Sequence, residues 1–171
     1  INLGLGQPDV PTPEHAREAA IEAIRSGKLT LNVEKGTPEL REAIATKHDR
    51  ENDFSVDPEN VIATSGGSEA LHLVIAAHVN PGEEVIYPDP GFVSYEALTH
   101  VAGGDPKPVP LRGDLTLDPA TVEAAITEDT AAFVVNSPAN PTGAVQSVAD
   151  MREFARIADE HGVVCISDEV Y

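Results

Sequence analysis

The sequence predicts an α/β fold in which a mostly parallel sheet is flanked by helices. Short apolar runs alternate along the chain with amphipathic stretches, as repeated strand–helix–strand units require. Two of these runs, 133–135 and 163–166, are apolar at every position. Such strands are typical of a sheet that is covered by helices on both faces. Residues 1–30 lack the alternation, so they are expected to form an N-terminal arm and one helix apart from the sheet.

Capping residues give the expected bounds of the helices. Thr12 precedes Pro13 and is expected to be the N-cap of the first helix, which Gly27 can end. The same Thr-Pro signal recurs before the second helix, while Asp118 and Ser147 are expected to cap the last two. The expected helices span 13–26, 39–50, 68–79, 93–101, 119–126 and 148–161.

The strands are expected between these helices and after the last of them, where apolar and β-branched residues cluster next to turn residues. Gly66-Gly67 ends the first of them, and Asn80-Pro81-Gly82 is a turn before the second. The expected strands span 61–64, 85–87, 109–111, 131–135 and 163–166.

Composition excludes several classes of function. The chain carries 29 acidic and 11 basic residues, a formal net charge of −18, which disfavours nucleic acid and anionic membranes as partners. Because the acidic residues are dispersed, they indicate a halophilic source, although an ordinary acidic cytoplasmic protein is the alternative. No membrane-spanning stretch and no leader are visible, so a cytoplasmic protein is expected. The chain begins at Ile1 and stops at Tyr171 within a promising segment, so it is interpreted as a fragment.

Metal and thiol chemistry are also disfavoured. The single cysteine, Cys165, lies in an apolar strand and is interpreted as a small buried hydrophobic residue. The six histidines have no spacing typical of metal ligands and are interpreted as structural or solvated. No metal site is therefore expected.

The polar residues that could carry chemistry follow the predicted strands. Ligands of open α/β sheets bind beyond the carboxyl ends of the strands, so these residues are expected at one rim. Gly66-Gly67-Ser68 joins a strand to a helix N-terminus, which suits a phosphate but is also a common tight turn. The polar loop 136–143 contains Asn140, and Asn-Pro there can also mark a simple turn. Asp168 follows an apolar strand and needs a hydrogen-bonding or cationic partner, although a local cap or ion pair would also satisfy it.

Taken together, these segments resemble the class I/II aminotransferases of the fold-type I family, which depend on pyridoxal 5'-phosphate (PLP). The matching segments occur in family order and cover almost the whole chain. They are Gly6-Gln7-Pro8-Asp9 with Thr12-Pro13, Gly36-Thr37-Pro38-Glu39-Leu40-Arg41, Gly66-Gly67-Ser68-Glu69-Ala70, Asn80-Pro81-Gly82-Glu83-Glu84-Val85, Asn136-Ser137-Pro138-Ala139-Asn140-Pro141-Thr142-Gly143 and Ser167-Asp168-Glu169-Val170-Tyr171.

The resemblance implies a PLP-dependent transferase fold, with an arm and the first helix of the small domain in residues 1–30. Residues 31–171 would then be the first part of an incomplete PLP-binding large domain. It also implies transfer of an amino group from an L-amino acid, aspartate-like or aromatic, to a 2-oxo acid. The implied partner is a second copy of the chain, in a homodimer whose active site lies at the interface.

The resemblance further implies a role for each candidate site residue. Gly66, Gly67 and Ser68 would bind the cofactor phosphate, and Phe92 would stack on the pyridine ring. Asn140 and Tyr171 would donate hydrogen bonds to the 3'-oxygen of the ring. Asp168 would pair with the ring nitrogen, keep it protonated and so let the ring accept electrons. Gly6 and Asn140 would lie beside the substrate.

Two departures from the family pattern qualify this assignment. Leu31 stands where many relatives have a tyrosine that reaches the phosphate of the neighbouring subunit. The Schiff-base lysine and the substrate-binding arginine of the family lie beyond residue 171, so residues 1–171 alone are expected to be inactive. None of the lysines present (Lys28, Lys35, Lys47 and Lys107) lies in that motif.

Three alternative functions follow from the same residues. A PLP-dependent lyase or synthase of the same fold would share the motifs, because these motifs set the electronics of the cofactor. A PLP-sensing domain of a transcription regulator would need a DNA-binding module before Ile1. A Rossmann-type nucleotide-binding domain is disfavoured, because no Gly-x-Gly-x-x-Gly follows the first predicted strand.

Overall fold

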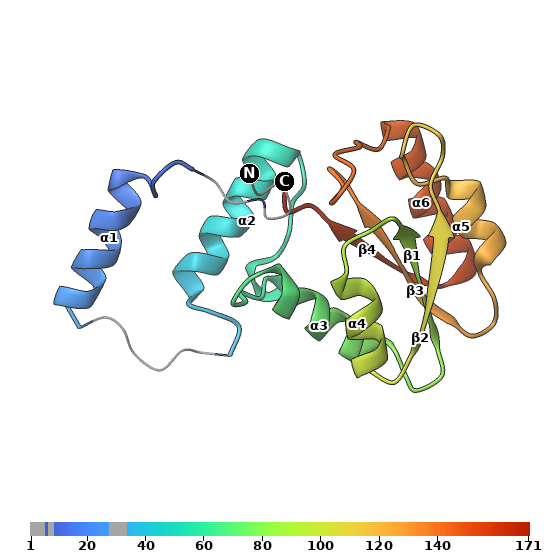
Figure 1. The fold of residues 1–171 in the computed structure, drawn as a ribbon. Coiled ribbons are helices and arrows are strands. Elements are labelled where there is room, and N and C mark those ends of the chain that lie inside the picture. The colour runs from blue at the N-terminus through green and yellow to red at the C-terminus, as the bar shows by residue number, and fades with distance from the viewer. Residues whose placement is uncertain (1–5, 7–8, 28–33) are drawn as a thin grey trace. The chain divides into compact units, whose positions relative to one another are not determined.

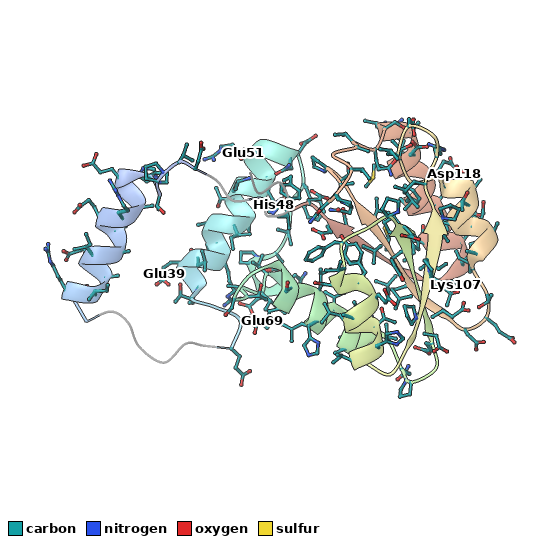
Figure 2. All side chains as sticks on the ribbon, in the orientation of Figure 1. Glu39, His48, Glu51, Glu69, Lys107 and Asp118 are labelled. Atoms are coloured by element: carbon teal, nitrogen blue, oxygen red, sulfur yellow. The ribbon has the colours of Figure 1, made fainter. Side chains whose placement is uncertain are left out.

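The computed structural model describes all residues except 1–5, 7–8 and 28–33. Two compact units are formed, by residues 1–63 and 64–171. The expected domain boundary after residue 30 lies outside the described residues and stays a prediction. Leu31 lies outside them as well. Acidic side chains occur in both units, as Glu39, Glu51, Glu69 and Asp118 illustrate in Figure 2.

In its described residues, the first unit contains two helices and one short 3-10 turn. These elements are α1 (Glu14–Arg25), α2 (Pro38–Asn52) and η1 (Pro58–Asn60). The N-cap of α1 is Pro13, without a side-chain capping bond, so the expected cap at Thr12 is wrong. The cap of α2 is confirmed, because the Thr37 hydroxyl accepts a hydrogen bond from the Leu40 N–H.

The strand expected at 61–64 does not form. The run has β-branched residues, yet no described part of the chain forms a strand beside it, and its Ala63 N–H bonds to a single carbonyl, that of Lys35. Ile62 remains 55% exposed, so hydrophobic burial does not favour a sheet here either. An isolated strand gains few hydrogen bonds for the conformational entropy it loses, and propensity alone does not stabilise it.

The second unit is a four-stranded parallel sheet with helices on both faces (Figure 1). The mostly parallel sheet expected from the sequence is confirmed, with strand order β2-β1-β3-β4. The strands are β1 (Glu84–Asp89), β2 (Asp105–Pro110), β3 (Thr130–Asn136) and β4 (Val164–Asp168). The helices are α3 (Gly67–His78), α4 (Ser94–Val101), α5 (Pro119–Ala125) and α6 (Val148–His161).

Alternate residues of each central strand pack into two separate cores. On one face, Val85 and Val134 pack with Ile75 of α3 and Tyr95 of α4. On the other face, Ile86, Phe133 and Val135 pack against Val122 of α5 and against Phe154 and Ile157 of α6. The run 133–135 in β3 therefore has the buried environment that the sequence predicted, whereas the run 163–166 is only partly buried at the edge strand β4.

The edge strand β2 has proline at every second residue. Pro106, Pro108 and Pro110 alternate with Lys107 and Val109. The Asp105 N–H bonds to the Glu83 carbonyl, so the odd-numbered residues direct their N–H groups toward the β1 side. Proline has no N–H, and it is tolerated in a sheet only where no ladder bond needs one. The strand is therefore longer than the expected 109–111, because prolines at the outward positions do not end it.

Candidate functional site

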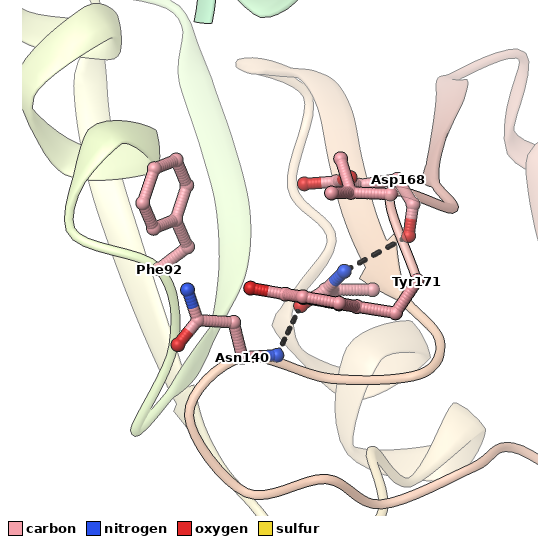
Figure 3. Close-up of a pocket in the computed structure, with 6 residues that line it drawn as sticks. Phe92, Asn140, Asp168 and Tyr171 are labelled. Atoms are coloured by element: carbon pink, nitrogen blue, oxygen red, sulfur yellow. Dashed lines mark hydrogen bonds between the residues drawn. The ribbon is translucent and has the colours of Figure 1, made fainter. Parts of the chain in front are cut away.

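A pocket lies where the carboxyl ends of β1, β3 and β4 meet, as expected for ligand sites of parallel sheets. Its lining comprises Phe92, Asn136, Asn140, Asp168, Val170 and Tyr171. Figure 3 shows the Phe92 ring and the Asn140, Asp168 and Tyr171 side chains gathered around the same space. The cavity measures about 90 Å³, below the roughly 300–1,000 Å³ typical of ligand pockets, so these residues form only part of a ligand-sized site.

The carboxylate of Asp168 is held at one oxygen. Asp168 is the last residue of β4, and its Oδ2 accepts a hydrogen bond of 2.6 Å from the Tyr95 hydroxyl. Tyr95 is fully buried, and burial, followed by the hydrogen bond with Asp168, raises the pKa of its hydroxyl. The hydroxyl therefore remains a protonated donor at physiological pH. Within the described residues, Oδ1 of Asp168 has no hydrogen-bond partner and is available to a ligand.

Phe92 and Tyr95 occupy the turn that begins α4. The Tyr95 N–H bonds to the Phe92 carbonyl at 3.2 Å, and the two rings meet edge to face with centroids 5.7 Å apart. This arrangement is favoured by the quadrupoles of aromatic rings. The turn thus fixes the Phe92 ring and the donor to Asp168 together.

The loop after β3 is held by hydrogen bonds to its own backbone and to β4. The Asn136 side chain, only 6% exposed, donates from Nδ2 to the Asp168 carbonyl at 2.9 Å. Its Oδ1 accepts from the Asn140 N–H at 2.7 Å. The Ser137 N–H also bonds to the Asp168 carbonyl, and the Gly143 N–H bonds to the Ala139 carbonyl. The loop is therefore an ordered segment that presents the Asn140 side chain to the pocket.

The N-terminus of α3 lies next to this pocket. A Cβ built on Gly67 would come 3.5 Å from Cγ2 of Val170, which lines the pocket. Gly66 is the N-cap with φ of 111°, a conformation that L side chains rarely adopt. The Ala70 N–H makes the first helical bond, to the Gly66 carbonyl, so the N–H groups of 67–69 precede the hydrogen-bond ladder. Such groups at a helix N-terminus suit an anion.

The structure brings together most of the candidate site residues. Phe92, Asn140, Asp168 and Tyr171 line one pocket, and Gly67 lies at its border. Gly66 and the exposed Ser68 belong to the same helix N-terminus. Gly6 belongs to the other compact unit, so its place beside the substrate stays a prediction. The ligand-binding roles of all these residues also stay predictions.

Tyr95 and Asn136 are the site residues that the sequence did not single out. Tyr95 lies in an apolar helical stretch, and its partner is 73 residues away in the chain, so no local pattern reveals the pair. Asn136 was part of the expected polar loop, but its bond to Asp168 depends on how β3 and β4 pair. Cys165 is partly buried rather than fully buried, and this burial raises the pKa of its thiol to about 11. The described part of the chain contains no cluster of residues able to hold a metal ion.

Comparison with known proteins identifies the family. The chain matches the family Aminotransferase class I and II over residues 1–171. It is 42% identical to a probable aspartate aminotransferase of Methanocaldococcus jannaschii and 45% identical to the aspartate/prephenate aminotransferase of Thermus thermophilus. All of this chain is covered in both alignments, but only 46% and 45% of the two relatives.

Solved structures agree with the sequence relatives. A mutant of the Thermus thermophilus aspartate aminotransferase superposes with a TM-score of 0.96 at 46% identity, covering 99% of this chain and 47% of that one. The aromatic aminotransferase of Pyrococcus horikoshii superposes with a TM-score of 0.95 at 40% identity, covering 99% and 46%. The chain thus spans less than half the length of these relatives. Because the family match extends over every residue and the fold agrees throughout, the chain belongs to the class I and II aminotransferases.

Proposed function

We propose that the full-length protein is a PLP-dependent aminotransferase that moves an amino group from an L-amino acid, aspartate-like or aromatic, to a 2-oxo acid. Support comes from the family membership and from the names of relatives, which include aspartate and aromatic aminotransferases. The observation that carries the proposal is the half-satisfied carboxylate of Asp168. Tyr95 holds its Oδ2, Oδ1 has no partner among the described residues, and Asp168 lines a pocket with an aromatic ring, an amide and a phenol.

The residues present fit PLP by their chemistry. Asp168 offers an acceptor to the ring nitrogen, and Phe92 offers a flat apolar face to the ring. Asn140 and Tyr171 offer donors to the 3'-oxygen. The N-terminus of α3, with Gly66, Gly67 and Ser68, offers N–H groups and a hydroxyl to the phosphate. When bound, PLP supplies an electron-accepting ring that carries the amino group between the two substrates.

Each residue then has a defined task. Asp168 keeps a proton on the ring nitrogen, because a nearby carboxylate favours the charged form of a base. The hydrogen bonds from Asn140 and Tyr171 favour the ionised form of the 3'-oxygen for the same reason. Phe92 excludes water from one face of the ring, and Gly6 and Asn140 lie beside the substrate. None of Lys28, Lys35, Lys47 and Lys107 is assigned the task of the family's Schiff-base lysine.

The organisation of the whole protein is part of the proposal. Residues 1–30 are the arm and the first helix of the small domain, and residues 31–171 begin the PLP-binding large domain. The active protein is a homodimer with its active site at the interface. It works in the cytoplasm. The net charge of −18, carried by acidic residues that are dispersed along the chain, supports a halophilic origin. Within the described residues, no helix is long and apolar enough to cross a membrane.

Transfer between defined substrates tests this proposal. The purified full-length protein is incubated with PLP, 2-oxoglutarate and either L-aspartate or L-phenylalanine, and glutamate formation is measured. We expect multiple turnovers with at least one of the two donors, and none without 2-oxoglutarate. Consumption of the amino acid without formation of glutamate would contradict transamination and indicate a lyase or synthase instead.

A further inference from the structure

The Asn136 side chain joins two residues of the pocket, Asn140 in the loop after β3 and Asp168 at the end of β4. Its Nδ2 donates to the Asp168 carbonyl at 2.9 Å, and its Oδ1 accepts from the Asn140 N–H at 2.7 Å. These two bonds are the dashed lines in Figure 3. Because one amide group makes both, the distance between the backbones of Asn140 and Asp168 is set by the dimensions of a single planar group.

The polarity of the partners fixes the orientation of this amide. A backbone carbonyl can only accept and a backbone N–H can only donate, so rotation of the amide by 180° would break both bonds. The side chain is only 6% exposed, so water cannot readily replace a lost bond. The site therefore requires a side chain that donates one hydrogen bond and accepts another, and the Asn136 amide does both.

The neighbouring Ser137 makes a useful contrast. Its Oγ accepts from the Gln146 N–H at 3.0 Å, so it holds the same loop, but this bond does not reach Asp168 or Asn140. The Ser137 N–H does bond to the Asp168 carbonyl, and a side-chain substitution leaves that bond in place. Loop stability and the spacing of the two pocket residues can thus be changed separately.

We propose that Asn136 is a positioning residue that sets the spacing between Asn140 and Asp168, and hence between the groups that bind the 3'-oxygen and the ring nitrogen of PLP. The inference rests on the proposed function, since it concerns the same cofactor. Asn136 acts through its two neighbours: when it is lost, Asp168 remains present but no longer faces the ring nitrogen in the correct place.

The experiment uses the full-length protein and the variants Asn136→Ala, Asn136→Ser, Ser137→Ala and Asp168→Asn. PLP dissociation constants are measured by equilibrium binding, and the ring nitrogen of bound 15N-labelled PLP is followed by NMR. We expect Asn136→Ala to weaken PLP binding about tenfold, as the loss of two buried hydrogen bonds predicts. We expect the 15N signal to move toward the unprotonated position, whereas Ser137→Ala changes the affinity less than about twofold.

A double-mutant cycle separates positioning from general loop stability. Since Asn136 acts largely through Asp168, the variant Asn136→Ala/Asp168→Asn should lose clearly less affinity than the product of the two single losses. Asn136→Ser replaces the amide by one short hydroxyl and covers the case in which Asn136→Ala does not fold. Its affinity should then lie between those of the wild type and Asp168→Asn, with the same displacement of the 15N signal.

Failure of the inference is distinguishable from failure of the proposed function. If the wild type binds no PLP, the proposed function is wrong. If the wild type binds PLP and Asp168→Asn weakens it, the inference is overturned by an unchanged 15N signal in the Asn136 variants, or by equal effects of Asn136→Ala and Ser137→Ala.

Discussion

The two ends of the parallel sheet each hold a carboxylate, and their surroundings differ. At the amino end, Glu84 of β1 accepts hydrogen bonds from Lys107 on both oxygens, at 2.9 and 2.8 Å. Its Oε2 accepts further bonds from the hydroxyls of Thr127 and Thr130. At the carboxyl end, the Asp168 carboxylate accepts one hydrogen bond among the described residues, from the Tyr95 hydroxyl on Oδ2. Figure 2 labels Lys107, which marks the amino-end cluster on the edge strand.

The difference distinguishes a structural acid from one that is available to a ligand. Partial burial opposes the ionisation of Glu84, but the hydrogen bonds from Lys107, Thr127 and Thr130 outweigh it and lower the pKa of this carboxyl. Both carboxylate oxygens of Glu84 thus accept hydrogen bonds from the protein itself. Asp168 keeps one oxygen free beside a pocket, and a partly satisfied polar group of this kind is typical of a binding site.

The largest effect is expected at the carboxyl end. Asp168→Asn in the full-length protein removes the charge opposite the ring nitrogen, so PLP affinity should fall about 100-fold. The amide oxygen can still accept from Tyr95, so the thermal midpoint should change by less than about 3 °C. Equilibrium PLP binding and thermal unfolding of the apoprotein measure the two quantities. Unchanged PLP affinity would remove Asp168 from the site.

Tyr95→Phe should give the next largest effect. It keeps the buried ring but leaves Oδ2 of Asp168 without its donor, so PLP affinity should fall about tenfold, as expected for a lost hydrogen bond to a charged group. Tyr87→Phe is the matched control. Tyr87 lies in the same core with its ring centroid 6.5 Å from that of Tyr95, and its hydroxyl makes no hydrogen bond among the described residues. Equal losses in the two variants would refute the role of the Tyr95 hydroxyl.

At the amino end, the effect should be on stability alone. Glu84→Gln removes the charge that Lys107 pairs with, and the free energy of unfolding should fall by about 1–2 kcal/mol. PLP affinity should not change, because the cluster lies at the other end of the sheet. Urea unfolding measures the first quantity. Glu128→Gln is the control, since this exposed residue near the cluster makes no ion pair or hydrogen bond in the described structure.

The smallest effect is the pH dependence of the difference in unfolding free energy between the wild type and Glu84→Gln. The pKa of Glu84 is lower in the folded protein than its ordinary value of 4.5, so the ionised form stabilises the fold above about pH 4.5. This stabilisation is lost as the pH falls through the lower, folded value. The gap in unfolding free energy between wild type and Glu84→Gln should therefore be constant from pH 7 to 5 and shrink below pH 4.5. A gap that grows on acidification would contradict the assignment.

The fold was largely predictable from the sequence because its signals are local. Pro38 after Thr37, and Ser147 three residues before Asp150, mark helix starts that the structure confirms. The strand expected at 61–64 was wrong because pairing, unlike capping, depends on a distant partner, and the residues that the structure describes provide none there. Glu84 received no role from the sequence for the same reason, since Lys107 and Thr127 reach it from separate elements.

In the candidate site, too, the features with local sequence signals were predictable and those that depend on long-range packing were not. Phe92, Asn140, Asp168 and Tyr171 follow strand ends, and the topology of a parallel sheet brings such positions to one rim. Tyr95 could not be predicted, because its hydroxyl reaches Asp168 only after α4 packs on the sheet. An apolar helix containing a tyrosine indicates core packing, and nothing local distinguishes a tyrosine that also orients a carboxylate.

The prolines of β2 have a consequence for the behaviour of the protein at high concentration. An edge strand normally presents a row of free N–H groups on which another chain can add a strand. In β2 the outward positions are Pro106, Pro108 and Pro110, which carry none. An incoming strand would find carbonyl acceptors but no donors, and could form only half of a ladder. This edge of the sheet is thereby protected against edge-to-edge polymerisation by residues that leave its pairing with β1 intact.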